Sequence, residues 1–219
     1  MLGGEDDQLP PRSAALARFA TALTAAPWSI TPEFGAELAA QGLGAEAVQA
    51  ATGVTAMFNY LTRVADATGI EFDYRSPLPE FQPDRGREPV PRPERAAWPV
   101  VAFPEMTDAW QQWHGYVFDS DTPLARRERR LLAAAAAQEC CDRARADELA
   151  DHTPHDDREL LLVAFARKLS REPWRMVPAD LQALRDARYP EPALLHAISV
   201  VALQNAESRL AMGHALTIG

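Results

Sequence analysis

The segment FARKLSREPWRMVPAD, residues 165–180, repeats an earlier part of the chain, FATALTAAPWSITPEF, residues 19–34. The match continues without a gap at a constant offset of 146 residues, as far as Ala65 in the first copy and Ala211 in the second. Identical pairs include Phe19/Phe165, Leu23/Leu169, Pro27/Pro173, Trp28/Trp174, Pro32/Pro178, Leu38/Leu184, Asn59/Asn205 and Arg63/Arg209. Self-similarity at a fixed offset indicates a duplicated supersecondary unit.

Each copy has the pattern of a run of helices, and no stretch reads as a convincing strand. Apolar residues recur at helical spacing over 13–26 and again over 156–170. Thr31, Pro32 and Glu33 form a helix start, which predicts a short helix over 32–41 that ends at Gly42. The second copy predicts the corresponding helix over 178–187. The expected fold class is therefore all-α.

A long helix is expected over 45–68, with its counterpart over 192–214. The first of these is expected to bury one side, which carries Val48, Ala51, Val54, Thr55, Phe58, Leu61 and Val64. Asn59 and Arg63 share one face of that helix, as do Asn205 and Arg209 on the other, since side chains four residues apart lie on one side. Buried polar groups need hydrogen-bond partners, so a structural role tying the long helices to their neighbours is predicted. Trp28 and Trp174 are expected to fill the core.

The part of the chain between the copies differs in character. Residues 74–105 contain eight prolines and many charges, which predicts an extended connector, with disorder as the alternative. The predicted organisation is a first repeat over 1–73, a connector over 74–106 and a second repeat over 107–219. Within the second repeat, Thr107-Asp108 is expected to cap one helix, and Thr122-Pro123 is expected to start another that runs to about Ala150. The arginines in the first turns of this second helix are expected to be solvated or paired with acids, and the alanines in its middle to be buried.

Composition excludes several functions. The chain has 219 residues and a formal net charge of −9, which argues against nucleic acid and anionic membranes as partners. No apolar run approaches the length of a membrane span, and the acidic start lacks the features of a signal peptide. Two adjacent cysteines make no disulfide framework, so a reducing cytoplasm is the expected location.

Chemistry-bearing residues are few. Cys140 and Cys141 are the only thiols, and a helix through both would turn their side chains about 100° apart. The interpretation as small core residues competes with a reactive site. The five histidines lack metal-ligand spacing, His152 and His155 are expected in a solvated loop, and no nucleotide or serine-hydrolase motif is present. No cofactor or metal is therefore predicted.

The repeated pattern resembles a known family. The stretches ARKLSREPWRMVPADLQALRDARYPEPALLHAISVVALQNAESRLA and FNYLTRVADATGIEFDYRSPLP look like the C-terminal half of the alkylhydroperoxidase D-like domain, of the carboxymuconolactone decarboxylase superfamily, and most of all like its peroxidase-related branch. The resemblance covers about residues 14–79 and 107–214. It implies an internally duplicated helical fold of that type and a homo-oligomer.

The family's redox motif, E…C-x-x-C-x-x-x-H, is altered in this chain. The corresponding stretch reads AQECCDRARADEL. If Cys141 matches the second family cysteine, Gln138 and Arg145 replace the first cysteine and the histidine, and this register is favoured. If Cys140 instead matches the first, Glu128 falls at the relay glutamate, while Arg143 and Asp147 replace the second cysteine and the histidine.

The resemblance implies two hypotheses of different classes. In the first, the protein is a thiol-dependent antioxidant enzyme in which Cys141 attacks a peroxide, Cys140 or an external thiol resolves it, and Glu139 or Glu128 assists proton transfer. In the second, the protein is a degenerate homologue with a structural or partner-binding role, its partner being a separate C-x-x-C protein, whereas the first hypothesis calls for a thiol reductant as partner. Lactone decarboxylation has no convergent His/Glu set to support it.

Overall fold

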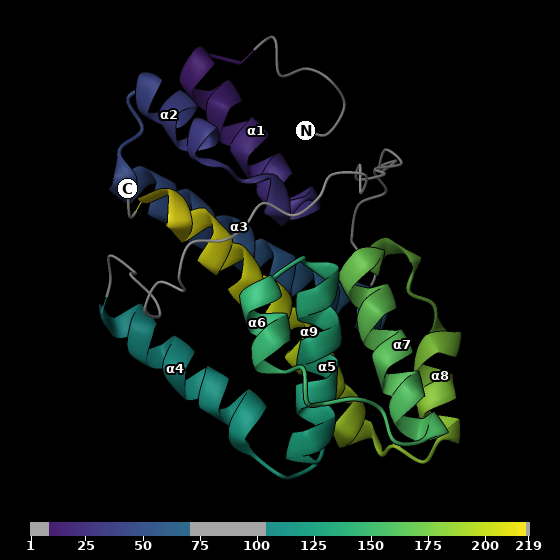
Figure 1. Cartoon of the computed structure of the whole chain (residues 1–219). Helices are drawn as coiled ribbons and strands as arrows, with labels where there is room; N and C mark the ends of the chain where they lie inside the picture. The colour runs from purple at the N-terminus through teal and green to yellow at the C-terminus, as the bar shows by residue number, and fades with distance from the viewer. Residues whose placement is uncertain (1–8, 71–103, 218–219) are drawn as a thin grey trace.

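The computed structural model describes residues 9–70 and 104–217, and within these ranges every regular element is a helix (Figure 1). The prediction of an all-α fold is confirmed for this part of the chain. The prediction of a proline-rich connector lies outside it. The described helices are all too short or too polar to cross a bilayer.

The duplication is present in the helix bounds themselves. The first set comprises α1 Pro11–Ala25, the 3-10 turn η2 Pro27–Ser29, α2 Pro32–Ala40 and α3 Ala45–Thr68. The second comprises α7 Asp157–Arg171, η3 Pro173–Arg175, α8 Pro178–Asp186 and α9 Glu191–His214. Every element of the second set begins and ends 146 residues after its counterpart. Residues related by this offset are called equivalent below.

In the described part of the segment between the two sets, residues 104–156, lie three helices: α4 Pro104–Asp119, α5 Arg126–Glu139 and α6 Arg143–Glu148. Two predicted starts were displaced, since α4 begins before Thr107 and α5 begins after Thr122-Pro123. The prediction of one helix reaching Ala150 was wrong. The chain leaves helical geometry at Cys141, where φ is 54°, and Asp142 starts α6 by accepting a hydrogen bond from the Arg145 backbone nitrogen. An aspartate side chain that caps a new helix competes with continuation of the old one.

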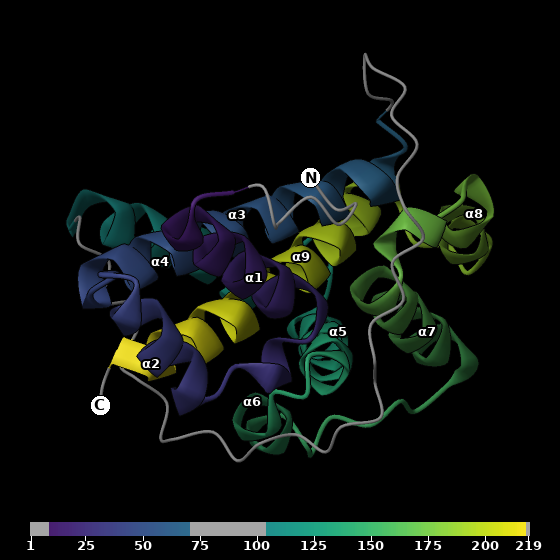
Figure 2. The same ribbon diagram turned by 90° about the horizontal axis from the view of Figure 1, so that it is seen from above.

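Helix α9 is the centre of the molecule. It is buried along nearly its whole length, including polar side chains such as Gln204, Asn205 and Arg209. Figure 2 shows α9 between α3 on one side and α5 on the other, both of which contact it. As predicted, the alanines in the middle of α5 are buried, and their small side chains allow close helix packing. Gly213 of α9 lies so close to Thr52 of α3 that an added Cβ would meet its side chain at 2.4 Å.

The predicted buried side of α3 was partly wrong. Thr52, Ala56, Asn59 and Arg63 are buried, while Val54, Phe58 and Leu61 are 59%, 63% and 49% exposed. The side that faces α9 thus carries small and polar residues, and hydrophobicity alone pointed to the opposite side. Trp28 is buried as predicted, but Trp174 is 46% exposed.

The arginines of α5 also depart from the expected pattern. Arg127 pairs with Glu159, as predicted. Arg129, however, is fully buried and donates to the backbone oxygens of Leu124, Val117 and Thr122 at 2.8, 2.5 and 2.8 Å. This side chain fastens the turn between α4 and α5 by satisfying carbonyl groups that have no helical partner.

Candidate functional site

The two duplicated Asn/Arg pairs meet inside the protein. On α9, Arg209 donates from Nη1 to the Asn205 backbone oxygen at 2.9 Å and to Asn205 Oδ1 at 3.1 Å. On α3, Arg63 donates from Nη1 to the Asn59 backbone oxygen at 3.0 Å and to Asn59 Oδ1 at 2.9 Å. All four residues are buried. The predicted structural role of these pairs is therefore met by real hydrogen bonds.

Each pair also reaches the loop end of a shorter helix, and here the two repeats exchange partners. The amide of Asn59 donates to Thr24 Oγ1 at 2.9 Å, and that of Asn205 donates to Ser170 Oγ at 2.8 Å, each within its own repeat. The arginines do the reverse. Arg209 Nη2 donates to the backbone oxygen of Thr24 at 2.7 Å, and Arg63 Nη2 donates to that of Ser170 at 3.0 Å. Thr24 and Ser170 are equivalent, so the arrangement is a crossed clamp.

Cys140 lies against this clamp. It is the C-cap residue of α5, its backbone N–H bonds to Ala136, and it is 2% exposed. Its Sγ donates to Asn205 Oδ1 at 3.2 Å and accepts from Arg209 Nη1 at 3.4 Å. The guanidinium groups of Arg63 and Arg209 donate otherwise to neutral oxygens, those of asparagine side chains and backbone carbonyls. Among these recorded acceptors, Cys140 Sγ is the one sulfur.

The electrostatics of the clamp are unusual because two cations are buried together. Burial lowers the pKa of Arg63 to about 9, and the neighbouring charge of Arg209 acts in the same direction. Cys140 and Asp66 oppose this shift, since a negative charge on either would stabilise the guanidinium. At neutral pH, Arg63 is still protonated. An anion at Cys140 Sγ would partly neutralise this excess positive charge.

Cys141 occupies a different environment. Its backbone is in the left-handed region, and its side chain is partly exposed rather than buried. Neither cysteine is in a disulfide. The expectation that a continuous helix separates the two side chains was wrong, because α5 ends at Glu139.

The two glutamates predicted for proton transfer are engaged elsewhere. Glu139 accepts from Arg171 Nε and Nη2 at 2.9 and 3.0 Å. Glu128 caps α5 by accepting from the Ala125 backbone nitrogen at 3.0 Å, and it also accepts from Tyr189 Oη at 2.8 Å. Because Glu128 precedes Cys140 by twelve residues, it lies about 18 Å away along the helix. The structure does not bring Glu128 to the cysteines.

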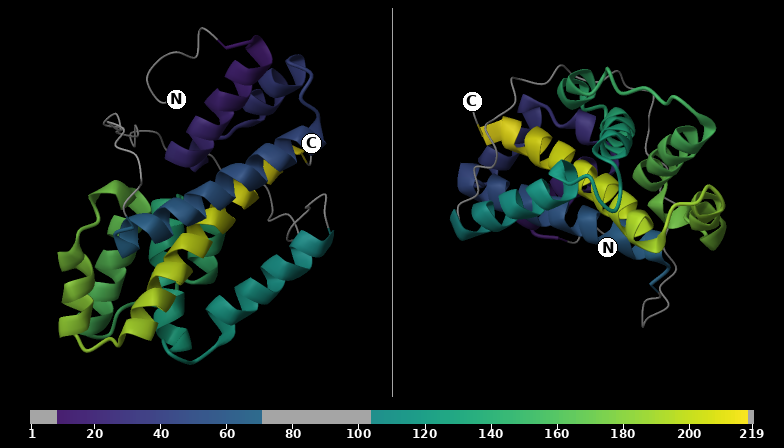
Figure 3. Two further views of the ribbon diagram at one scale, coloured as in Figure 1. Left: turned by 180° about the vertical axis from the view of Figure 1, so that it is seen from behind. Right: turned by 90° about the horizontal axis from the view of Figure 1, so that it is seen from below.

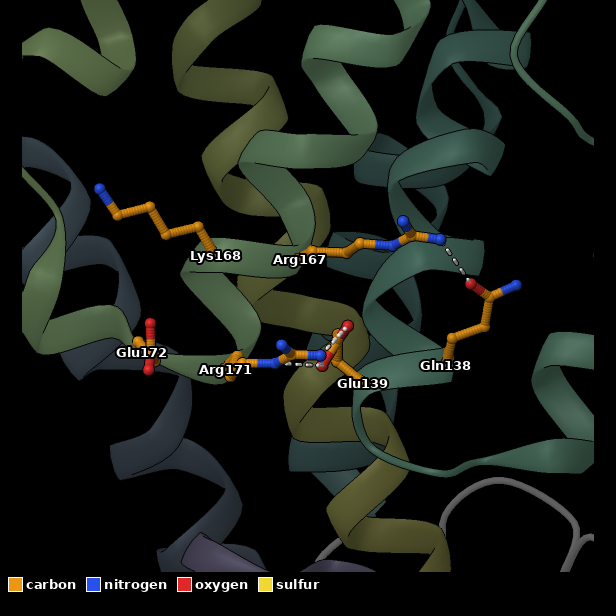
Figure 4. Close-up of a pocket in the computed structure, with 6 residues that line it drawn as sticks. All are labelled: Gln138, Glu139, Arg167, Lys168, Arg171 and Glu172. Carbon is orange, nitrogen blue, oxygen red and sulfur yellow. Dashed lines mark hydrogen bonds and ion pairs between the residues drawn. The ribbon is translucent and has the colours of Figure 1, made fainter. Parts of the chain in front are cut away.

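A surface pocket of about 420 Å³ lies beside the cysteine loop, between the C-terminal ends of α5 and α7. It is lined by Gln138, Glu139, Arg167, Lys168, Arg171 and Glu172. Figure 4 shows Arg167 and Arg171 extending across it toward Gln138 and Glu139. Lys168 is held by Asp180 at 2.7 Å. The lining is polar and carries both signs of charge.

The structure also places Arg145, Arg143 and Asp147, which the sequence resemblance matched to the histidine or the second cysteine of the redox motif. Arg145 donates from Nε to Gln204 Oε1 at 3.1 Å and pairs with Glu148 at 2.6 Å. Arg143 and Asp147 are exposed on α6. Among the described residues, no group of three His, Cys, Asp or Glu side chains is arranged to hold a metal ion. Sequence reasoning missed Ser170 and Thr24, although their equivalence at the repeat offset was a usable signal.

Comparisons with protein-family models, with curated proteins and with solved structures return no match to this chain.

Proposed function

We propose that the chain is an alkylhydroperoxidase D-like protein that reduces peroxides with the thiol of Cys140. The observation that supports this is the 3.4 Å contact between Arg209 Nη1 and Cys140 Sγ, beside a second buried arginine. The thiolate is the nucleophilic form of cysteine, and Arg209 is the cation that lies against Sγ of Cys140. The sequence resemblance supplies the reaction class, and the contact favours Cys140 over Cys141 as the attacking residue.

The reaction balances as follows. The thiolate sulfur attacks one peroxide oxygen, so that an S–O bond forms while the O–O bond breaks. The leaving alkoxide takes a proton from water and departs as an alcohol, and Cys140 becomes a sulfenic acid. A thiol reductant then condenses with the sulfenic acid, releases water and leaves a mixed disulfide. A second reductant thiol displaces Cys140, which returns to its reduced form as the reductant is oxidised to a disulfide.

The resolving thiol is external in this proposal. A disulfide between adjacent residues is strained, so Cys141 is the less favourable partner. The burial of Cys140 means that a small peroxide must enter through local opening at the α5–α6 junction. Neither Glu128 nor Glu139 is assigned a proton-transfer role, because both are held in other contacts.

The test is rapid mixing of reduced protein with peroxide, followed by mass spectrometry of the peptide that contains both cysteines. Wild type and Cys141→Ser are expected to form one sulfenic acid per chain, and Cys140→Ser none. Arg209→Met is expected to slow oxidation about tenfold or more, since it removes the charge beside the sulfur. The matched control is Arg143→Met, an exposed arginine nearby. Equal peroxide consumption by Cys140→Ser and wild type would refute the proposal.

A second candidate is a structural or partner-binding helical protein without redox activity. The observation that favours it is the burial of Cys140, whose sulfur already has two partners in the core. It predicts that a thiol reagent labels Cys140 only after denaturant unfolds the protein. Stoichiometric labelling of Cys140 in the native state would exclude this candidate.

A further inference from the structure

Helices α5 and α7 pack side by side (Figure 3), and the surface pocket at their C-terminal ends has a charge pattern that the proposed reaction does not use. Its volume of about 420 Å³ is that of a small-molecule site. Three of its lining residues are cations and two are acids: Arg167, Lys168, Arg171, Glu139 and Glu172. The lining is therefore positive overall, which favours an anionic ligand.

Two of the three cations already have a carboxylate partner. Arg171 donates to Glu139 from both Nε and Nη2, at 2.9 and 3.0 Å. Lys168 Nζ donates to the two carboxylate oxygens of Asp180 at 2.8 and 2.7 Å. A cation that is held by a carboxylate has to give up that contact before it can bind a second one, so neither residue is the favoured anchor for a ligand.

Arg167 is different. Within the described part of the chain no carboxylate pairs with it, and its Nη2 lies 3.5 Å from the neutral Gln138 Oε1, at the limit of a hydrogen bond. Figure 4 shows its side chain extended across the pocket toward Gln138. A guanidinium group binds a carboxylate through two parallel hydrogen bonds. Because Glu139 and Glu172 repel a doubly charged phosphate more strongly, a singly charged carboxylate is the anion that fits this pocket.

The pocket and the buried thiol share the last turns of the same two helices. On α7, Ser170 is buried in the crossed clamp, whereas Arg167 and Arg171 line the pocket. On α5, Cys140 is buried, whereas Gln138 lines the pocket two residues earlier, about 3 Å away along the helix axis. Local opening of this last turn, which the burial of Cys140 already requires, exposes the sulfur beside the pocket.

We infer that this pocket is the binding site of the external reductant, and that the reductant is a small thiol that carries a carboxylate. The carboxylate binds Arg167, which leaves the thiol free to condense with the sulfenic acid of Cys140. In that step an S–S bond forms, the S–O bond breaks and water leaves. A second molecule of the same thiol then displaces Cys140 from the mixed disulfide. The inference rests on the proposed reduction of peroxides by Cys140, because no sulfenic acid forms without it.

The first experiment measures how fast mercaptopropionate, mercaptoethanol and cysteamine, which are anionic, neutral and cationic, remove the sulfenic acid of the full-length protein. Comparing wild type with Arg167→Met cancels the intrinsic reactivity of each thiol. The variant is expected to slow mercaptopropionate about threefold to fivefold, the range of an exposed ion pair, without slowing mercaptoethanol. Arg130→Met, at an exposed arginine of α5 outside the pocket, is the control and is expected to match wild type. Equal rates for Arg167→Met and wild type with mercaptopropionate would overturn the inference.

A second measurement separates the pocket from the chemistry. Methylthiopropionate has the carboxylate but no thiol, and its titration into isotope-labelled protein, followed by NMR, is expected to shift the backbone amide signals of Gln138, Arg167 and Arg171. The shifts are expected to be lost in Arg167→Met, and circular dichroism checks that the variant is folded. A wild type without shifts would overturn the carboxylate site even if Cys140 reacts with peroxide. Shifts together with an inert Cys140 would overturn the reductant role and the proposed reduction, and the carboxylate site alone would stand.

Discussion

Arg209 donates from Nη2 to the backbone oxygen of Thr24 at 2.7 Å, across 185 positions of the chain. Through this bond the last long helix holds the end of the first helix. We predict that Arg209→Met destabilises the protein by about 3 kcal/mol, because it removes the donor to the Thr24 carbonyl and leaves the buried Asn205 Oδ1 with only the weak thiol donor of Cys140. Urea unfolding followed by circular dichroism measures the change.

The control for that prediction is Arg143→Met, which is expected to change the free energy of unfolding by less than about 0.5 kcal/mol because this arginine is exposed. The equivalent variant in the other repeat, Arg63→Met, is expected to resemble Arg209→Met. If Arg209→Met were as stable as the control, the crossed clamp would not stabilise the fold.

The two short helices end in the same way but with different residues. Gly42 and Arg188 are equivalent, and their φ angles are 71° and 66°. The left-handed region suits glycine and strains an arginine, so we predict that Arg188→Gly raises the free energy of unfolding by about 1 kcal/mol. The reciprocal variant, Gly42→Ala, is expected to lower it by a similar amount. Thermal unfolding distinguishes the opposite signs, and a loss of stability in Arg188→Gly would contradict this account.

The close approach of α3 and α9 at Gly213 makes a packing prediction. A Cβ added there would meet Thr52 Cγ2 at 2.4 Å and Oγ1 at 2.5 Å, so Gly213→Ala is expected to cost about 1–3 kcal/mol. Thr52→Ala removes both atoms. The double variant is therefore expected to be less destabilised than the sum of the single variants, and a double-mutant cycle measures the difference. Simple additivity would mean that the helices separate to accept the methyl group.

Tyr189 makes the stability of the protein depend on alkaline pH. Burial and the hydrogen bond to Glu128 raise the pKa of Tyr189 above its ordinary value of 10.0. The folded state therefore keeps this proton at a pH where the unfolded chain has lost it. Its contribution is complete below pH 10.0 and is lost as the pH rises above that value. Urea unfolding from pH 8 to 11 is expected to show a steeper loss of stability for wild type than for Tyr189→Phe, and parallel curves would refute the coupling.

The duplication made much of the fold predictable. Pro32 and Gly42 marked the ends of α2 correctly, and Pro178 marked the start of α8 146 residues later, so the copies supported each other. The prediction of one continuous helix through α5 and α6 failed, because Asp142 caps a new helix where the alanine-rich pattern favoured continuation. The prediction of which side of α3 is buried also failed in part, since hydrophobic periodicity identifies an apolar face without showing whether anything covers it.

The candidate site was less predictable than the fold. Adjacency of Cys140 and Cys141 drew attention to both, but only tertiary structure shows that Cys140 lies against Asn205 and Arg209. The contact joins residues that are 69 positions apart. The repeated sequence predicts which residues share a face of each long helix. It does not predict that the end of α5, which lies between the copies, places Cys140 against that face.

The exchange of carbonyl acceptors between Thr24 and Ser170 has a consequence for how the chain can be divided. A fragment with one repeat would keep the bonds between its own asparagine and arginine, but it would lose the carbonyl oxygen that the other repeat offers to the Nη2 of that arginine. The two repeats are therefore expected to melt together in one transition despite their separate helices. If the chain were cleaved between the two repeats, the fragments would have to associate again before either could fold stably.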